Sequence, residues 1–409
     1  MPHAPLLTAT LIFVATYALI GIQGIPRIHI DRPSGALLGA VAMVAFGVLT
    51  LPQAYQAIDL DTILFLLGMM ILIAYLELSG FFEVLERWVI GLARSTRALL
   101  ALVVWSSGVL SALFMNDTVC LLYAPVIVRV TKRLGLNPIP YLIALATSAN
   151  IGSVATIIGN PQNALIGMQS HIRFVEFSRR LWPVAAAGLL VDFAIIAWIY
   201  RKEITPAPLV VPPPRKPGTV QRWMLFVSIS AACAMLVLLC LNFHAPAVAM
   251  ALASIVILAG SRRPSRALQQ VDWTLLFLFA GLFVVMRGVE EAGLTTLIFR
   301  RTQFLLGENS VAAAAGLSAV IAALSNLVSN VPAVMLYIPL LKARAAGDTL
   351  WLLLAMASTL AGNLTIIGSV ANLIVLEATK EDVRISFLEY LKTGLPVTLL
   401  TIVAGVMIL

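Results

Sequence analysis

The stretch MNDTVCLLYAP at residues 115–125 returns as SNVPAVMLYIP at residues 329–339. In both copies a short polar break separates two apolar runs, and an Asn, a Tyr and a Pro recur at a spacing of 214 residues. The tetrapeptide TIIG likewise occurs at 156–159 and at 365–368, and an Asn follows four residues after each Gly. Four more residues recur 213 positions later, namely Asp59, Gly68, Glu77 and Gly80. These matches predict a chain of two homologous halves.

The composition requires a membrane environment. Of the 409 residues, 60% are hydrophobic and 11% are charged, and the mean hydropathy is +0.98. A soluble domain has roughly 45–50% apolar and about 25% charged residues, so no water-soluble fold could bury this much apolar surface. The net charge of +8 comes from basic residues in short loops, without a basic stripe interleaved with aromatic residues, which argues against nucleic-acid binding. The three cysteines show no metal-ligand spacing.

Apolar runs long enough to cross a bilayer, which takes about 20 residues, follow one plan in each half. In the first half we expect spans near 5–22, 34–51, 60–78, 140–167 and 181–200, with a pair of shorter pieces at 98–115 and 118–134. In the second half we expect spans near 223–241, 245–260, 273–289, 350–376 and 393–409, with a pair at 310–328 and 331–345. The predicted fold class is an all-α polytopic membrane protein of two repeats, residues 1–200 and 222–409, joined by a Pro-rich cytoplasmic linker at 201–221.

The basic residues predict how the halves lie in the membrane. Each half has five spans and one paired segment that returns to its starting side, so the second half enters from the opposite face. With both termini in the periplasm, most of the 27 Lys and Arg residues, including Arg27, Arg32, Arg262 and Arg263, lie in cytoplasmic loops. We therefore expect two inverted-topology repeats in a bacterial inner membrane. The first apolar run lacks a basic region before it and a cleavage site, so we expect it to stay as a helix.

Polar breaks within the apolar runs identify the candidate site, because non-helical backbone in lipid costs several kcal/mol per unsatisfied group. The breaks form two pairs, 115–118 with 329–332 and 159–163 with 368–372. They create half-helix ends, where N–H groups attract anions and carbonyls attract cations, and Asn side chains both donate and accept there. The candidate substrate- or ion-binding residues are Asn116, Asp117, Thr118, Asn150, Ser153, Thr156, Asn160, Asn163, Ser329, Asn330, Asn363, Thr365, Ser369 and Asn372. The alternative is that these side chains join neighbouring helices.

Asp117 is the most specific of these candidates, because a carboxylate at membrane depth costs roughly 2.5–3.5 kcal/mol or more. Its counterpart Val331 is neutral. A lone acid indicates a proton site, a cation site or a partner for a neutral protic solute, and the alternative is an N-cap for the helix 118–134. Asp192, in the middle of the span 181–200, is either a second proton-relay group or a partner for a Ser or Thr of a neighbouring helix.

The motifs MNDTVCLLYAPV, ANIGSVATIIGNPQNALIG, SNVPAVMLYIPL and STLAGNLTIIGSVANLIV resemble those of the ion transporter superfamily. Within it they are most similar to the arsenite/antimonite permease and sodium–proton antiporter branch, over nearly the whole chain from about residue 30. The resemblance implies a re-entrant helical hairpin and one broken helix in each half, and a homodimer with a scaffold and a moving transport unit. The first tip, Asn116-Asp117, resembles the arsenite permeases, whereas the dicarboxylate branch carries Ser-Asn-Thr at both tips.

The residues and the resemblance favour a secondary active antiporter that exports arsenite or antimonite against protons and so confers arsenic resistance. Asn, Ser and Thr side chains suit a small neutral hydroxide, and Asp117 would bind the exchanging proton. The alternatives are sodium–proton exchange, transport of a small oxyanion or dicarboxylate, and, in a different class, an intramembrane enzyme with Asp117 and Asp192 as an acid pair. We expect no cofactor and no metal. The expected partners are the solute, a coupling proton or sodium ion, the lipid bilayer, a second copy of the chain and a soluble ATPase.

Overall fold

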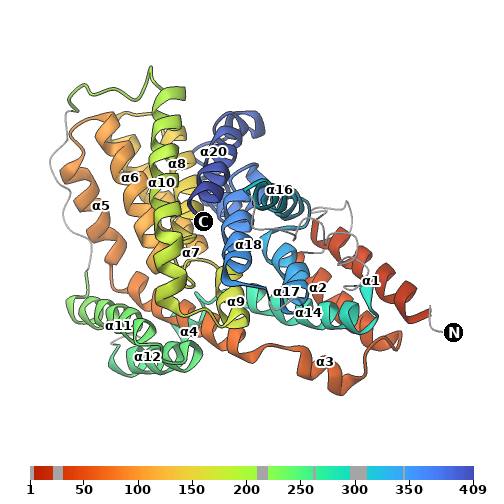
Figure 1. The fold of residues 1–409 in the computed structure, drawn as a ribbon. Helices are drawn as coiled ribbons and strands as arrows, with labels where there is room; N and C mark the ends of the chain where they lie inside the picture. The colour runs from red at the N-terminus through yellow and green to blue at the C-terminus, as the bar shows by residue number, and fades with distance from the viewer. Residues whose placement is uncertain (1–3, 22–30, 210–219, 261–263, 295–310, 344–345) are drawn as a thin grey trace.

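The chain folds into helices joined mostly by short connections (Figure 1). The computed structural model describes residues 4–21, 31–209, 220–260, 264–294, 311–343 and 346–409. Within these ranges the regular structure is helical, apart from one isolated bridge between Ser95 and Pro208. Seven of the helices described are long and apolar enough to cross a membrane, which confirms the all-α membrane class. Several residues used for the topology lie outside the described residues, namely Arg27, Arg262, Arg263 and the linker prolines of 210–219.

The helices of the first half follow the expected spans and add two short ones. In chain order they are α1 Ala4–Gly21, α2 Arg32–Ala45, α3 Leu51–Ala57, α4 Leu60–Leu78, α5 Phe81–Leu92, α6 Thr96–Leu113, α7 Asn116–Leu134, α8 Ile139–Ser153, α9 Pro161–Ser170 and α10 Phe174–Ile199. Hydropathy predicted neither α3 nor α5, because both are too short to cross a bilayer. α6 and α7 form the expected paired segment, and α8 and α9 form the broken helix.

The second half repeats this order. Its helices are α11 Arg222–Cys240, α12 Ala245–Ala259, α13 Pro264–Leu268, α14 Trp273–Glu291, α16 Val311–Val328, α17 Asn330–Ala343, α18 Asp348–Ala361, the 3-10 turn η2 Ile366–Gly368, α19 Val370–Thr379 and α20 Phe387–Ile408. Here α16 and α17 are the paired segment, and α18 and α19 are the broken helix. The short helix α13 takes the place that α3 has in the first half.

The breaks in the long helices begin several residues earlier than predicted. α8 ends at Ser153, and Pro161 opens α9 instead of interrupting a helix. A proline suits this first position, because its φ is already helical and the N–H that it lacks would have no intrahelical partner there. In the second half the break runs from the end of α18 to Ser369, the residue before α19. Asn163 and Asn372 therefore lie in the first turns of the second half-helices.

Two equivalent glycine contacts join helices of one half to helices of the other. α4 packs along α12, and α14 packs along α2, so each contact joins different halves. A Cβ on Gly68 would lie 2.7 Å from the carbonyl carbon of Ala249, and a Cβ on Gly281 would lie 2.7 Å from that of Ala36. Only glycine allows backbones to approach this closely. Gly281 follows Gly68 by 213 positions, and Ala249 follows Ala36 by the same number, as the repeat predicts. The opposite orientation of the halves in a bilayer stays a prediction.

The broken helices occupy the centre of the molecule. All residues of α8 from Pro140 to Ser153 and all residues of α18 from Trp351 to Ala361 are buried. In Figure 1, α11 and α12 lie at one end of the molecule and α1, α2 and α14 at the other, with the broken helices between them. The polar residues of the breaks are thus enclosed by protein on the sides, as irregular backbone at membrane depth requires.

The described start of the linker is fixed to the helical bundle. The amide of Thr205 donates to Oγ1 of Thr96 at 2.6 Å, and the amide of Leu209 donates to the carbonyl of Arg94 at 2.9 Å. Residues 201–209 therefore return along the N-terminal end of α6, beside the loop that joins α5 to α6.

Candidate functional site

The two helix breaks are closed by the same hydrogen bonds. Nδ2 of Asn163 donates to the carbonyls of Ser153 and Thr156, both at 3.0 Å. Nδ2 of Asn372 donates to the carbonyls of Gly362 and Thr365, at 2.7 and 3.0 Å. All three positions are 209 residues apart in the two halves. The Asn that follows each TIIG motif therefore provides side-chain donors to two carbonyls of its own break, where regular helical hydrogen bonds are interrupted.

The residue before each second half-helix is its N-cap. Oδ1 of Asn160 accepts from the amide of Asn163 at 2.8 Å, and Oγ of Ser369 accepts from the amide of Ala371 at 3.3 Å. These side chains begin α9 and α19 at equivalent places, because a capping oxygen satisfies one of the free N–H groups of a first turn.

Threonines attach each break to the hairpin of its own half. Oγ1 of Thr156 donates to the carbonyl of Ala112 in α6 at 2.5 Å. Oγ1 of Thr365 donates to Oδ1 of Asn326 in α16 at 3.2 Å, and Asn326 stands 214 positions after Ala112. At the first tip the amide of Asn116 also donates to the carbonyl of Gly159 at 2.9 Å. Hairpin and broken helix are thus connected as one body in each half.

Asn150 joins the first half to the break of the second. Its Nδ2 donates to Oδ1 of Asn363 at 2.8 Å and to Oδ1 of Asn372 at 3.2 Å. Its Oδ1 accepts from Nδ2 of Asn116 at 2.9 Å and from Oγ of Ser369 at 3.1 Å. Asn150 is almost fully buried, so these hydrogen bonds form away from competing water.

Thr359 makes the reciprocal connection. Its Oγ1 accepts from Nδ2 of Asn160 and from Nε2 of Gln162, both at 3.2 Å. It stands 209 positions after Asn150, at the same place in α18 that Asn150 has in α8. Ser153 belongs to the same group, because its Oγ accepts from Nδ2 of Asn160 at 2.8 Å.

The two hairpin tips meet at a central cavity of about 30 Å³, which holds roughly two water-sized groups. Its polar and charged lining comes from both tips, both broken helices and α2, namely Arg32, Asn116, Asp117, Gln162, Ser329, Asn330 and Ser369. Oδ1 of Asn116 is buried and has no hydrogen-bond partner among the described residues. Ser329 has a φ of +78°, a left-handed conformation that few non-glycine residues adopt. The central cavity therefore offers an unused acceptor beside a strained tip.

Asp117 lies in the first turn of α7, where its carboxylate can interact with the positive end of the helix. The alternative of an N-cap is wrong, because the N-cap position is held by Met115 and no side chain caps this helix. The carboxylate lines the central cavity and also a larger neighbouring cavity, so it connects the two.

Arg32 was expected in a cytoplasmic loop, but the structure places it in the wall of the central cavity. Helix α2 begins at Arg32, with Asp31 as its N-cap and Pro33 in the first turn. The helix therefore starts beside the hairpin tips, and the long side chain lies within electrostatic reach of Asp117. The position of a basic residue at the edge of an apolar run could not reveal this.

Two larger cavities have equivalent walls. The Asp272 cavity, about 280 Å³, is lined by polar residues that include Glu77, Gln269, Asp272, Asp117 and Thr118. The Arg287 cavity, about 420 Å³, is lined by polar residues that include Gln56, Asp59, Glu290, Arg287, Gln169 and Lys342. Three residues of one cavity stand 213 positions before or after those of the other, in the pairs Gln56 and Gln269, Asp59 and Asp272, and Glu77 and Glu290. Of these two larger cavities, only the Asp272 cavity is lined by the tip residues Asp117 and Thr118.

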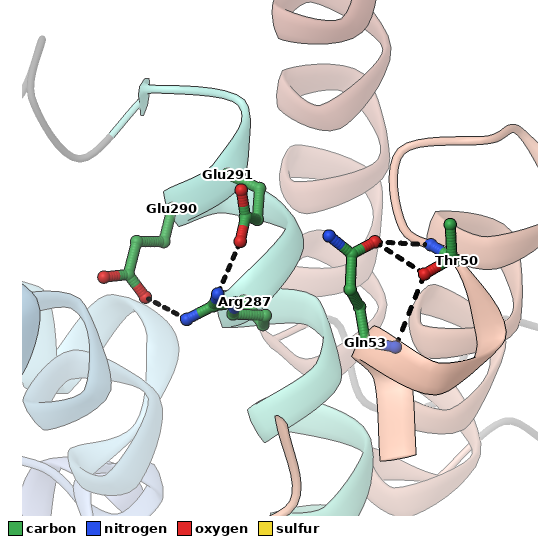
Figure 2. A network of polar contacts seen from close by, with 5 residues as sticks. All are labelled: Thr50, Gln53, Arg287, Glu290 and Glu291. Atoms are coloured by element: carbon green, nitrogen blue, oxygen red, sulfur yellow. Dashed lines mark hydrogen bonds and ion pairs between the residues drawn. The ribbon is translucent and has the colours of Figure 1, made fainter. Parts of the chain in front are cut away.

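The Arg287 cavity is crossed by polar contacts. Figure 2 shows Arg287 paired with Glu290 and Glu291 of its own helix, across from Gln53, which forms a capping box with Thr50. Deeper connections join three helices, because Lys342 of α17 donates to Gln169 of α9, which in turn donates to Asp59 at the start of α4.

Asp192 lies apart from the central cavity, within α10. Its side chain is fully buried, and neither carboxylate oxygen has a hydrogen-bond partner among the described residues. No group of three His, Cys, Asp or Glu side chains that could bind a metal ion occurs in the described part of the chain.

The structure brings most of the predicted residues to one place. Around the central cavity and its hydrogen-bond network lie Asn116, Asp117, Asn150, Ser153, Asn160, Asn163, Ser329, Asn330, Asn363, Ser369 and Asn372, while Thr118 lies in the Asp272 cavity and Thr156 and Thr365 fix the hairpins. The prediction missed Arg32, Gln162 and Thr359. The repeat could have revealed Thr359, since it is the counterpart of Asn150.

Known proteins resemble this chain along most of its length. A family model described as "Citrate transporter" (CitMHS) matches residues 17–361. The silicon efflux transporter LSI3 of Oryza sativa subsp. japonica is 31% identical, with 96% of this chain and 95% of that relative covered. An uncharacterised transporter of Mycobacterium bovis is 30% identical over 96% of this chain and 95% of its own length. The putative transporter arsB of Dictyostelium discoideum is 26% identical over 97% of this chain and 90% of its own length.

A solved structure shows the same fold. The YdaH transporter of Alcanivorax borkumensis superposes with a TM-score of 0.57 at 13% identity, with 100% of this chain and 97% of that chain covered. At this identity the likeness concerns the arrangement of the helices, and the chemistry of the site must be argued from this chain.

Proposed function

This chain belongs to the CitMHS citrate transporter family, within the ion transporter superfamily, and on that premise we propose that it exports arsenite or antimonite in exchange for protons. The family and the relatives identify the chain as a polytopic membrane transporter. The proposal concerns the solute, the coupling ion and the direction of movement.

The observation that carries the proposal is the unused acceptor in the central cavity. Oδ1 of Asn116 is buried without a hydrogen-bond partner among the described residues. A buried acceptor left unpaired costs about 1–3 kcal/mol, so a solute that donates a hydrogen bond there is favoured. The surrounding Gln162, Ser329 and Asn330 can donate and accept in turn. A neutral hydroxide, which carries several O–H groups on one small centre, matches this lining.

The size of the cavity supports a small solute. In the conformation described, the space between the tips is about 30 Å³, and it must widen less for a centre with three hydroxyl groups than for a tricarboxylate. Citrate, the solute in the family's description, would also bring three carboxylates to a lining with a single arginine and an aspartate. Like charges placed close together are unfavourable, so Asp117 opposes such an anion.

Asp117 is the proposed proton site. Its carboxylate lies between the central cavity and the Asp272 cavity, so a proton and the solute would meet at one place. Competition between them couples their movements, provided that the inward and outward conformations differ in affinity for each. The Asp272 cavity, expected on the cytoplasmic side, adjoins the tip, whereas the equivalent Arg287 cavity does not. Such an unequal pair of cavities supports alternating access.

Silicic acid is a second candidate for the solute. The rice relative, similar over 96% of this chain, is named a silicon efflux transporter. Silicic acid is also a small neutral hydroxide, so the same lining and the same Asp117 would serve it. The homodimer, the periplasmic termini and a soluble ATPase partner remain predictions beside this proposal.

The test is uptake into everted membrane vesicles that contain the full chain and are energised by respiration. Arsenite, silicic acid, citrate and sodium-dependent proton movement are measured separately, with and without a protonophore. We expect accumulation of arsenite or silicic acid that collapses with the protonophore. The variant Asp117→Asn should lose this accumulation, and Glu381→Gln, a change to an exposed acid, should keep it.

Other outcomes overturn the proposal in distinct ways. Accumulation of citrate without either hydroxide would show that the chain transports the solute in its family's description. Sodium-dependent proton movement alone would make it a cation exchanger. Accumulation that survives Asp117→Asn would move the proton site elsewhere.

A further inference from the structure

The two halves differ in charge at two equivalent positions. Arg32 opens α2, and Ala245 opens α12 213 positions later, with a proline following each. Asp117 lies in the first turn of α7, and its counterpart at the second tip is Val331. One cation and one anion of the first half thus have apolar counterparts in the second half.

The structure brings both departures into one cavity. Arg32, Asp117 and Val331 all line the central cavity, and the charges of Arg32 and Asp117 lie within electrostatic reach of one another. Among the described residues that line the central cavity and the adjoining Asp272 cavity, Arg32 is the one cation. The other charged groups that face Asp117 from packed helices are Asp272 of α14 and Glu77 of α4, both in the Asp272 cavity.

Arg32 and Asp117 are half-buried, and a single charge in a small, partly desolvated cavity is less favourable than a pair of opposite charges. With both side chains ionised, the wall of the central cavity carries one positive and one negative charge. A neutral solute then enters without leaving either charge uncompensated, whereas an anion would compete with Asp117 for the guanidinium of Arg32.

We propose that Arg32 is a specificity-determining residue of the central cavity, because its guanidinium balances the carboxylate of Asp117 and so makes the cavity select a neutral hydroxide over an oxyanion. This inference rests on the proposed function for the neutral solute, but the predicted binding of an oxyanion by the variants does not. Removal of the carboxylate leaves Arg32 as the charged residue among the described residues that line the central cavity, which should convert this cavity to an oxyanion site. Removal of both charges should abolish that gain.

The experiment measures binding, because a variant of Asp117 is expected to lose proton-coupled accumulation. The full chain is purified in detergent, and binding of arsenate and of arsenite is followed by calorimetry at neutral pH. We expect arsenate to bind Asp117→Asn about tenfold or more tightly than the wild type. The double variant Asp117→Asn with Arg32→Gln should lose this gain, and Asp117→Asn with Arg32→Lys should retain most of it.

A control separates local charge from net charge. Arg94 is exposed on the loop before α6, so Asp117→Asn with Arg94→Gln has the same net charge as the Arg32 double variant and should keep the gain in arsenate binding. If Asp117→Asn is not monodisperse, Asp117→Ser replaces it. If neither folds, Arg32→Gln alone carries the test, with arsenate inhibition of transport weakened about tenfold relative to the wild type.

The proposal is overturned if Asp117→Asn binds arsenate no better than the wild type. It is also overturned if the double variant Asp117→Asn with Arg32→Gln binds arsenate as tightly as Asp117→Asn alone. If the wild type binds neither arsenite nor silicic acid, the proposed function is contradicted instead. The arsenate comparison among the variants would still decide the role of Arg32.

Discussion

Asn150 and Thr359 occupy equivalent positions in the two halves, and each reaches across to the helix break of the other half. Asn150 donates to Asn363 in the second break at 2.8 Å, and Thr359 accepts from Asn160 in the first break at 3.2 Å. The two breaks are therefore held together by a reciprocal pair of contacts. A conformational change that separates the halves must break both, so this pair belongs to the machinery that fixes the central cavity.

Asn150→Asp should be more destabilising than its near-isosteric shape suggests. The change replaces a donor with an acceptor that faces Oδ1 of Asn363 and Oδ1 of Asn372. Two buried hydrogen bonds are lost and acceptors are opposed, so we expect a loss of about 2 kcal/mol or more in the free energy of unfolding. Thermal unfolding of the purified protein measures the change. Thr359→Ser, which keeps the hydroxyl, is the matched control, and equal stability of the two variants would contradict the network.

Asn163→Ala and Asn372→Ala should lower stability by similar amounts and leave solute affinity nearly unchanged. Each amide donates to two carbonyls of its own break, and each Oδ1 also has a partner, Thr359 for Asn163 and Asn150 for Asn372. We expect losses of about 1–3 kcal/mol in each variant, with KM of the folded protein within about twofold of the wild type. A KM raised far beyond that in one variant alone would instead place that Asn on the solute, as the sequence first suggested.

The sequence predicts the repeated parts of the fold well, because a motif that occurs twice at a fixed spacing can be recognised without a structure. TIIG and the Asn after it identify the breaks, and Asn116 and Asn330 identify the tips. Hydropathy likewise locates α4, whose bounds match the expected span 60–78. These features depend on local chemistry, namely apolar length and backbone groups that need a partner.

Features that arise from the contact of distant segments could not be predicted. Arg32 follows the pattern of a loop residue, yet the packing of α2 along α14 brings its side chain to the hairpin tip. The breaks begin at residues 154 and 362, before the polar clusters that marked them, and those clusters contain Asn160 and Ser369, the N-caps of the following helices. The short amphipathic helix α5 also escaped a search for spans, since its length is below that needed to cross a bilayer.

Gly68→Ala and Gly281→Ala should each destabilise the chain. The added methyl group would lie 2.7 Å from backbone carbon atoms of Ala249 and Ala36, which no side-chain rotation can relieve. We expect losses of about 1–3 kcal/mol, measured by thermal unfolding. Gly91→Ala in α5 is the matched control, because nothing lies within 4 Å of its new Cβ, and it should be neutral or stabilising by up to about 1 kcal/mol. Destabilisation by Gly91→Ala as large as in the other two would show that the effect is not the helix crossing.

Asp192→Asn should fold as well as the wild type. The carboxyl is fully buried, and neither oxygen has a hydrogen-bond partner of regular geometry among the described residues. Thr147 of the adjacent α8 lies beside it, with its hydroxyl donating to the carbonyl of Ile143 at 2.9 Å. An ionised carboxylate would be very unfavourable in such a place, so the group is neutral in this conformation. An amide of the same shape should then change the free energy of unfolding by less than about 1 kcal/mol.

The same variant tests whether this buried acid relays the coupling proton. If it does, Asp192→Asn should lose respiration-driven accumulation of arsenite and retain exchange of arsenite between the two sides of a vesicle without a gradient, because exchange requires no net proton movement. Vesicles preloaded with unlabelled arsenite and supplied with labelled arsenite report both quantities in one preparation. Retention of accumulation would leave Asp192 as a buried neutral group and the coupling to Asp117. Loss of exchange in a folded variant would point to the solute path instead, since a relay acts on the proton alone.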